Sequence, residues 1–117
     1  MNKLNIFVCP ICGGVFLGYG KAKVECCGKL LSAVDVEIAA IKPIITEMDG
    51  EYLLEFDNPM TKEDYLAAIV VERYDQVTLH RLFPEQAAQV RLPQVKGAKV
   101  YAVHCRKSEV KAMLAQF

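Results

Sequence analysis

The sequence lacks several features that would place it in common functional classes. Its 117 residues carry 14 basic and 14 acidic side chains, so it has no basic surplus of the kind that nucleic-acid and anionic-membrane binders use. No apolar run approaches the roughly 20 residues that cross a bilayer. The segment Met1–Phe7 is too short and too mixed for a signal peptide. We therefore expect a soluble, cytoplasmic protein that binds neither nucleic acid nor membranes.

Repeats, low-complexity segments and long linkers are also missing from the sequence. The length fits one compact domain, or one domain with a small appendage. A hydrophobic content of 53% is enough to form a buried core, which excludes disorder as the main description.

Cysteine, by contrast, is frequent for a cytosolic chain of this size, and its distribution is uneven. The first 27 residues hold four of the five cysteines: Cys9, Cys12, Cys26 and Cys27. The fifth, Cys105, stands alone near the C-terminus. Because the cytosol keeps thiols reduced, we interpret the cluster as a metal site rather than as a disulfide framework.

The spacing within the cluster supports a single metal ion. Cys9 and Cys12 form a C-x-x-C pair followed by two glycines, which allow backbone N–H groups to point at sulfur. Cys26 and Cys27 are adjacent, and neighbours on a straight strand point to opposite faces. We therefore predict a bend at this pair, which Gly28 favours. Four thiolates form a closed tetrahedral site that suits zinc or a single iron.

Three other interpretations of these cysteines fit the spacing less well. They could be ordinary small buried residues, or they could form two disulfides, but four cysteines in nineteen positions flanked by glycine is typical of metal ligands. A thioredoxin-like redox pair would leave the second pair unexplained, and no βαβ pattern surrounds the first.

The pattern of the remaining sequence predicts short strands separated by turns. Asp49–Gly50 is a hairpin-type turn dipeptide. The segment 65–82 has both helical and strand features, and we favour strand because β-branched residues dominate it. Strand character is also found at residues 30–45, 51–56, 90–92 and 99–105. Six or seven such strands predict a mainly β fold with a β-sandwich.

The C-terminal tail shows a different pattern. Val110, Met113, Leu114 and Phe117 fall at i, i+3, i+4 and i+7, which predicts a short helix with one apolar face. We expect this helix to cover the core, and a contact in a dimer is the alternative.

Three pieces of the sequence resemble the desulfoferrodoxin or superoxide reductase family. The four N-terminal cysteines resemble a desulforedoxin-type module, which is rubredoxin-like. The stretch Asn58–Tyr65 resembles the part of the superoxide reductase domain that carries a His-Pro-Met motif and a second histidine six positions later. The stretch Val100–Ser108 resembles that domain's last strand, which ends in Cys-x-x-His. The pieces follow one another in the family's order.

This resemblance implies two domains, a four-cysteine metal module at residues 1–33 and an immunoglobulin-like β-sandwich at residues 34–117. It implies iron in the four-cysteine site, with zinc also possible. In the family, the sandwich holds a second iron with four histidines and one axial cysteine, and this iron reduces superoxide to peroxide. The resemblance also implies a homodimer, and a small electron-transfer protein is a possible partner.

The sequence departs from the family pattern at almost every ligand of the second iron. Residues of other types stand where the resemblance places histidines: Ile41, Asn58, Asp64 and Ser108. Only Cys105 remains, as the would-be axial ligand. We therefore predict a degenerate second site with no catalytic residue. Ile41 suggests that the former pocket has become apolar, and Cys105 is then a small buried residue.

The two histidines of the chain do not restore the lost ligands. His104 precedes Cys105, so the two side chains point to opposite faces of a strand. His80 lies far in sequence from every matched ligand position. We interpret both as partly exposed structural histidines.

Three functions are compatible with this pattern. The first is an electron carrier with iron in the four-cysteine site, because a thiolate cage lets iron change oxidation state with little rearrangement. The second is a non-enzymatic binding module in which zinc is a structural staple. The third is an active superoxide reductase with an atypical second site, which requires a second metal per chain. Whether the protein is an enzyme therefore depends on the second site.

Overall fold

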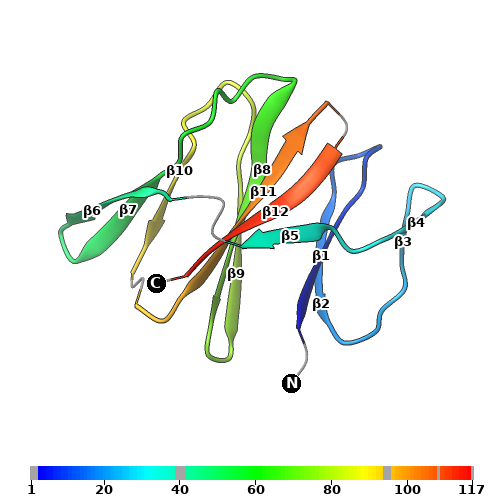
Figure 1. Cartoon of the computed structure of the whole chain (residues 1–117), viewed down its shortest axis with the longest axis horizontal. Coiled ribbons are helices and arrows are strands. Elements are labelled where there is room, and N and C mark those ends of the chain that lie inside the picture. Colours follow the sequence, from blue (N-terminus) through cyan, green and yellow to red (C-terminus); the bar gives the residue numbers. More distant parts are fainter. Residues whose placement is uncertain (1–2, 39–41, 94–95, 108, 117) are drawn as a thin grey trace. The chain divides into compact units, whose positions relative to one another are not determined.

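The protein is described by a computed structural model that covers residues 3–38, 42–93, 96–107 and 109–116 (Figure 1). Within these ranges the secondary structure consists of strands, with no α-helix. The mainly β prediction is therefore confirmed. The chain divides into two compact units, Met1–Asp35 and Val36–Phe117. Over the part described, no helix has the length and hydropathy needed to cross a membrane.

The first unit consists of two antiparallel hairpins. Its strands are β1 (Leu4–Val8), β2 (Val15–Tyr19), β3 (Val24–Cys26) and β4 (Lys29–Leu31). A small core forms around Phe7, Cys9 and Leu31, with Val24 and Cys26 packed against it. Two cysteines of the cluster are therefore part of the little hydrophobic core that this unit has.

The second unit contains two sheets. One has the strand order β5-β12-β11-β8-β9 and the other the order β10-β7-β6. The strands of the larger sheet are β5 (Asp35–Ile38), β8 (Asp64–Arg73), β9 (Gln76–Arg81), β11 (Lys99–Arg106) and β12 (Glu109–Gln116). Those of the smaller sheet are β6 (Ile44–Met48), β7 (Glu51–Glu55) and β10 (Gln89–Leu92).

A shared hydrophobic core joins the two sheets of this unit into a sandwich. From the smaller sheet it takes Leu54 and Leu92, and from the larger sheet Ile69 and Val100. Leu54, Ile69 and Val100 have no exposed surface. Because alternate residues of a strand face the same side, one face of each sheet supplies the core.

The turn predicted at Asp49–Gly50 is confirmed. Both residues have positive φ angles, 50° and 80°, and they join β6 to β7 with Met48 opposite Glu51. Two left-handed residues in a two-residue loop match the right-handed twist of the flanking strands. The preference for strand over helix at residues 65–82 is also confirmed, since this segment forms most of β8 and β9.

The prediction of a short C-terminal helix is wrong, because Glu109–Gln116 forms strand β12. This strand pairs with β11 along its whole length and also neighbours β5, so it is an interior strand. Ala112 and Leu114 are buried on one face, and Ala115 is buried on the other. Apolar residues on both faces imitate a helical pattern over eight residues, and periodicity alone does not separate the two cases. Phe117 lies outside the described residues.

Candidate functional site

A tight turn after β1 brings the first two cysteines together. The backbone N–H of Cys9 donates to the carbonyl of Gly14 at 2.9 Å, and the N–H of Gly13 donates to the carbonyl of Cys9 at 2.9 Å. Gly13 has a φ of 74°, in the left-handed region that favours glycine. A Cβ added at Gly14 would lie 3.3 Å from Cys12 Sγ, so glycine there keeps space beside the thiol.

The bend predicted at the second pair is present. Cys27 has a φ of 55° and Gly28 a φ of 73°, and these two residues form the loop between β3 and β4. Cys26 lies opposite Lys29 at the end of the hairpin. Two consecutive left-handed residues turn the chain sharply. Cys26 and Cys27 therefore do not follow the alternation of a straight strand.

The four thiols converge on one point. Their Sγ atoms all lie within 4.8 Å of one another. Cys12 Sγ lies 3.5 Å from Cys26 Sγ, which lies 3.9 Å from Cys27 Sγ. A tetrahedral ion with metal–sulfur bonds of about 2.3 Å places its ligands about 3.8 Å apart. The donor set therefore fits a single tetrahedral ion, iron or zinc, in both chemistry and spacing.

The site has a buried side and an open side. Cys9 is buried in the small core of the first unit, and Cys26 is half-buried. Cys12 and Cys27 are exposed. An ion held by these residues would have two sulfur ligands facing inward and two at the surface.

The pKa values of Cys9, Cys26 and Cys27 are shifted in different directions. The backbone amide of Cys12, with a smaller contribution from that of Ile11, lowers the pKa of Cys9 to about 6. Hydrogen bonds with Cys12 and Cys9 favour the protonated thiol of Cys26 and raise its pKa to about 12. Hydrogen bonds with the same two residues also raise the pKa of Cys27. Repulsion between like charges acts in the same direction as these hydrogen bonds, but its contribution to the pKa values is smaller. A cation placed at the centre would remove this repulsion and release the protons.

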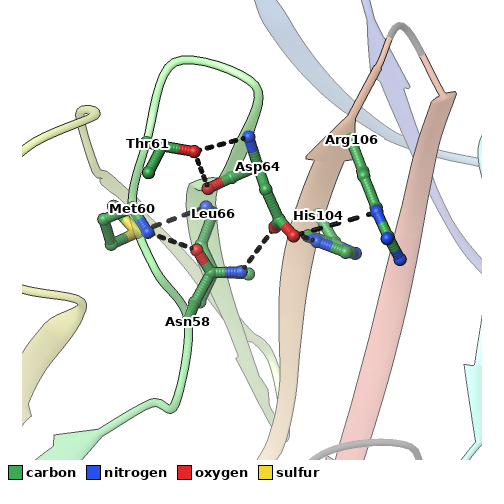
Figure 2. A network of polar contacts seen from close by, with 7 residues as sticks. All are labelled: Asn58, Met60, Thr61, Asp64, Leu66, His104 and Arg106. Carbon is green, nitrogen blue, oxygen red and sulfur yellow. Dashed lines mark hydrogen bonds and ion pairs between the residues drawn. The ribbon is translucent and has the colours of Figure 1, made fainter.

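Asn58 and Asp64, two positions that the family resemblance assigns to a second metal site, lie in the second unit and belong to a polar network (Figure 2). Asn58 Nδ2 donates to Asp64 Oδ1 at 3.1 Å, and Asn58 Oδ1 accepts from the N–H of Met60 at 2.8 Å. His104 Nε2 lies 2.7 Å from the same Asp64 oxygen. Arg106 Nε approaches the other carboxylate oxygen at 3.9 Å. The expectation of an apolar pocket is therefore not met at these positions.

Hydrogen bonds to its backbone fix the conformation of the loop before β8, which carries part of this network. The N–H of Asp64 donates to Thr61 Oγ1 at 3.1 Å, and the N–H of Thr61 donates to the carbonyl of Asp64 at 2.9 Å. Met60 has a φ of 53°, and its sulfur accepts from the N–H of Leu66 at 3.4 Å. Figure 2 shows the contacts between Thr61 and the backbone of Asp64 and between Met60 and the backbone of Leu66.

Strand register explains why His104 joins this network and Cys105 does not. The register of β11 against β8 shifts between Val103 and His104, so His104 lies opposite Leu66 and Cys105 opposite Tyr65. By alternation, His104 shares the face of Asp64 while Cys105 faces the other side. Sequence reasoning separated His104 from Cys105 correctly, but it missed the pairing of His104 with Asp64. That pairing depends on register between strands forty residues apart.

Cys105 is half-buried beside Tyr65. Burial raises the pKa of the Cys105 thiol, and a hydrogen bond with Tyr65 opposes this shift. The pKa of Tyr65 is raised in turn, mainly by burial. His80 lies apart from this region on β9, where its Nε2 is 3.3 Å from Thr78 Oγ1. Ile41 and Ser108, also assigned to the second site, lie outside the described residues.

The carboxylate of Asp64 is stabilised in its charged form. The hydrogen bond with His104 is the main cause, and the hydrogen bond with Asn58 and the charge of Arg106 act in the same direction, so the pKa of Asp64 lies below its ordinary value. Each polar side chain at the centre of the network already has a protein partner. Asn58, Asp64 and His104 therefore form a self-contained network rather than a set of free ligands.

The comparisons with known proteins show a shared fold. The chain is similar to the crystal structure of the superoxide reductase from Treponema pallidum, with a TM-score of 0.73, 21% sequence identity and coverage of 98% of each chain. No protein-family model matches the sequence, and no curated protein matches it either. At this identity, the likeness concerns the fold alone.

Proposed function

We propose that the protein is a one-electron carrier that holds a single iron with Cys9, Cys12, Cys26 and Cys27. The observation that carries this proposal is the convergence of the four Sγ atoms within 4.8 Å of one another. An iron bound by four thiolates supplies reversible one-electron chemistry with little change in geometry. The fold is similar to that of a superoxide reductase, a redox enzyme, and a redox role for this chain requires iron rather than zinc.

The residues around the cluster have defined roles in this proposal. Backbone amides that stabilise the Cys9 thiolate also reduce the electron density on sulfur, which tunes the potential of a bound iron. Cys12 and Cys27 lie at the surface, where a small electron-transfer protein could approach within short range of the ion. Buried Cys9 anchors the ion to the core of the first unit.

We further propose that the second site has lost the chemistry of superoxide reductases. A second iron of the family type needs several neutral imidazoles, and the described site offers His104 alone. That imidazole is engaged by Asp64, and the amide of Asn58 is engaged by Asp64 and Met60. These residues do not fit a second iron of that type, so we assign no catalytic step to this site.

A structural role for the metal is the second candidate. It is favoured by the packing of Cys9 and Cys26 in a small core whose other described members are Phe7, Leu31 and Val24. A unit of 35 residues with so small a core depends on an additional cross-link, such as a bound metal ion, for its stability. In that case the ion would be zinc, and it would undergo no redox change.

Metal analysis with a visible spectrum distinguishes these functions. Protein is purified without added metal from iron-rich cells, and its iron and zinc contents are measured per chain. The proposal predicts one iron, thiolate-to-iron absorption that bleaches on reduction, and a reversible one-electron potential. Zinc without colour from iron-rich cells would establish the structural module instead. Two irons per chain would contradict the degenerate second site.

A further inference from the structure

A small cavity opens between the two sheets of the second unit, at the other end of β8 from Asp64. It has a volume of about 60 Å³. Its walls are Val71 and Arg73 of β8, Gln76 and Thr78 of β9, and Leu92 and Pro93 at the end of β10. Neither the cysteine cluster nor the second-site network contributes to it.

Strand register places this cavity on the core side of the larger sheet. Val71 lies opposite Thr78, and Arg73 lies opposite Gln76, so all four side chains share one face of the β8–β9 hairpin. Val71 belongs to the sandwich core, which identifies that face as the inner one. Arg73 therefore continues the row of core-facing positions at the open end of the sandwich.

Arg73 has a buried hydrogen-bond donor with no partner among the described residues. Its Nε atom is inaccessible to solvent and makes no hydrogen bond to any of them. The guanidinium lies over the ring of Tyr74, with 5.6 Å between Arg73 Cζ and the ring centroid. This cation–π contact orients the group but supplies no acceptor. A buried N–H of a charged group without an acceptor is unfavourable, and native proteins seldom leave one unmatched.

The other walls of the cavity restrict what the missing acceptor can be. Among the described residues no acidic side chain lines the cavity, so its described walls offer no carboxylate to the Arg73 guanidinium. Gln76 and Thr78 add an amide and a hydroxyl, and Thr78 Oγ1 lies 3.3 Å from His80 Nε2. When His80 carries its proton on Nε2 and donates it to Thr78, the hydroxyl hydrogen is free for a ligand.

We propose that this cavity binds a short-chain monocarboxylate through Arg73. The planar guanidinium matches a carboxylate in geometry and charge, and its Nε–H supplies one of two parallel hydrogen bonds. Val71, Leu92 and Pro93 form an apolar wall for a short alkyl group. A cavity of about 60 Å³ limits the ligand to a few non-hydrogen atoms. This site is independent of the function proposed for the cysteine cluster.

Titration of the full chain with propionate, followed by ¹H–¹⁵N NMR, tests the proposal. The spectrum includes the Nε–Hε signals of arginine, and sodium chloride replaces propionate to keep ionic strength constant. We expect a saturable shift of the Arg73 Nε–Hε signal and of the backbone amides of Val71 and Thr78. A shift that rises linearly without saturation, or no shift at these groups, would refute the site.

Three variants define the role of the guanidinium. Arg73→Met should weaken propionate binding by about tenfold or more, because the paired hydrogen bonds and the charge are lost. Arg73→Lys keeps the charge and the fold but lacks the planar fork, so it should bind more weakly than the wild type. Arg91→Met is the matched control, because Arg91 is exposed on β10 next to Leu92 and faces away from the cavity. Equal binding by Arg73→Met and wild type would contradict the proposal.

A final arm tests the ligand class. Inorganic phosphate carries oxygen acceptors without an alkyl group, so it should compete with propionate only weakly. If phosphate binds at least as tightly as propionate, the assignment to a carboxylate is wrong. If butyrate and propionate bind more tightly than formate, the apolar wall contributes as proposed.

Discussion

His104 Nε2 lies 2.7 Å from Asp64 Oδ1, and the same oxygen accepts a hydrogen bond from Asn58 (Figure 2). Asn58 and Asp64 stand where the family resemblance places two histidine ligands of the second iron. Asn58, Asp64 and His104 thus satisfy one another's hydrogen-bonding groups. Each of these polar groups therefore has a protein partner.

The first prediction concerns the pH dependence of stability. Asp64 has a lowered pKa in the folded protein, so its carboxylate stabilises the fold above the ordinary carboxyl pKa and loses this effect as pH falls through the lowered pKa. We expect Asp64→Asn to lower the melting temperature at neutral pH. The difference from wild type should shrink steadily as the pH is lowered below about 4.

Melting curves by circular dichroism between about pH 2.5 and pH 7 measure this difference. Asp57→Asn is the matched control, because it removes an exposed carboxylate from the same segment. A constant difference between wild type and Asp64→Asn over the whole range would contradict the linkage.

Much of the fold was predictable from local patterns. The turn at Asp49–Gly50 follows from two residues that tolerate left-handed backbone, and this tolerance does not depend on the rest of the chain. The cysteine cluster could be found for a similar reason, because its spacing and glycines are local signals. The division of the cluster into buried and exposed thiols was not predictable, since it depends on packing.

What the sequence did not predict correctly depends on contacts between residues that lie far apart along the chain. The helical spacing of Val110, Met113 and Leu114 predicts a helix in the tail, but this segment is a strand that is buried on both faces between two neighbouring strands. The partnership of His104 with Asp64 depends on the register of β11 against β8, including a shift at Val103. Neither register nor two-sided burial is encoded in a short segment.

A second prediction concerns the sandwich core. Leu54 is fully buried between the sheets, while Leu53, its neighbour on the other face of β7, is half-buried. Leu54→Ala should lower the free energy of unfolding by about 2 to 5 kcal/mol, because it removes packed methyl groups and leaves a cavity. Leu53→Ala should cost clearly less. Urea unfolding measures both, and equal losses would mean that the inner face of β7 has been assigned to the wrong side.

A third prediction separates the two kinds of cysteine. Cys9→Ser should reduce the metal content from one ion per chain to almost none, because the variant loses a buried ligand that also belongs to the core. Cys105→Ser should keep one ion and an unchanged visible spectrum, since Cys105 is not part of the cluster. Elemental analysis of the three proteins prepared in parallel measures this. Loss of metal from Cys105→Ser would place a second ion in the sandwich and contradict a degenerate site.

The last prediction concerns Gly14, which limits the space beside the cluster. A Cβ at this position would lie 3.3 Å from both Cys12 Sγ and the Phe16 ring, closer than most such contacts. In the metal-free protein the exposed Cys12 side chain can move away at little cost. A bound ion fixes that sulfur, so Gly14→Ala should disfavour the metal-bound state specifically. We therefore expect a chelator to extract the metal several-fold faster from Gly14→Ala than from wild type. Gly18→Ala is the control, because a Cβ at Gly18 meets nothing within 4 Å. Equal extraction rates for all three proteins would show that Cys12 does not hold the ion.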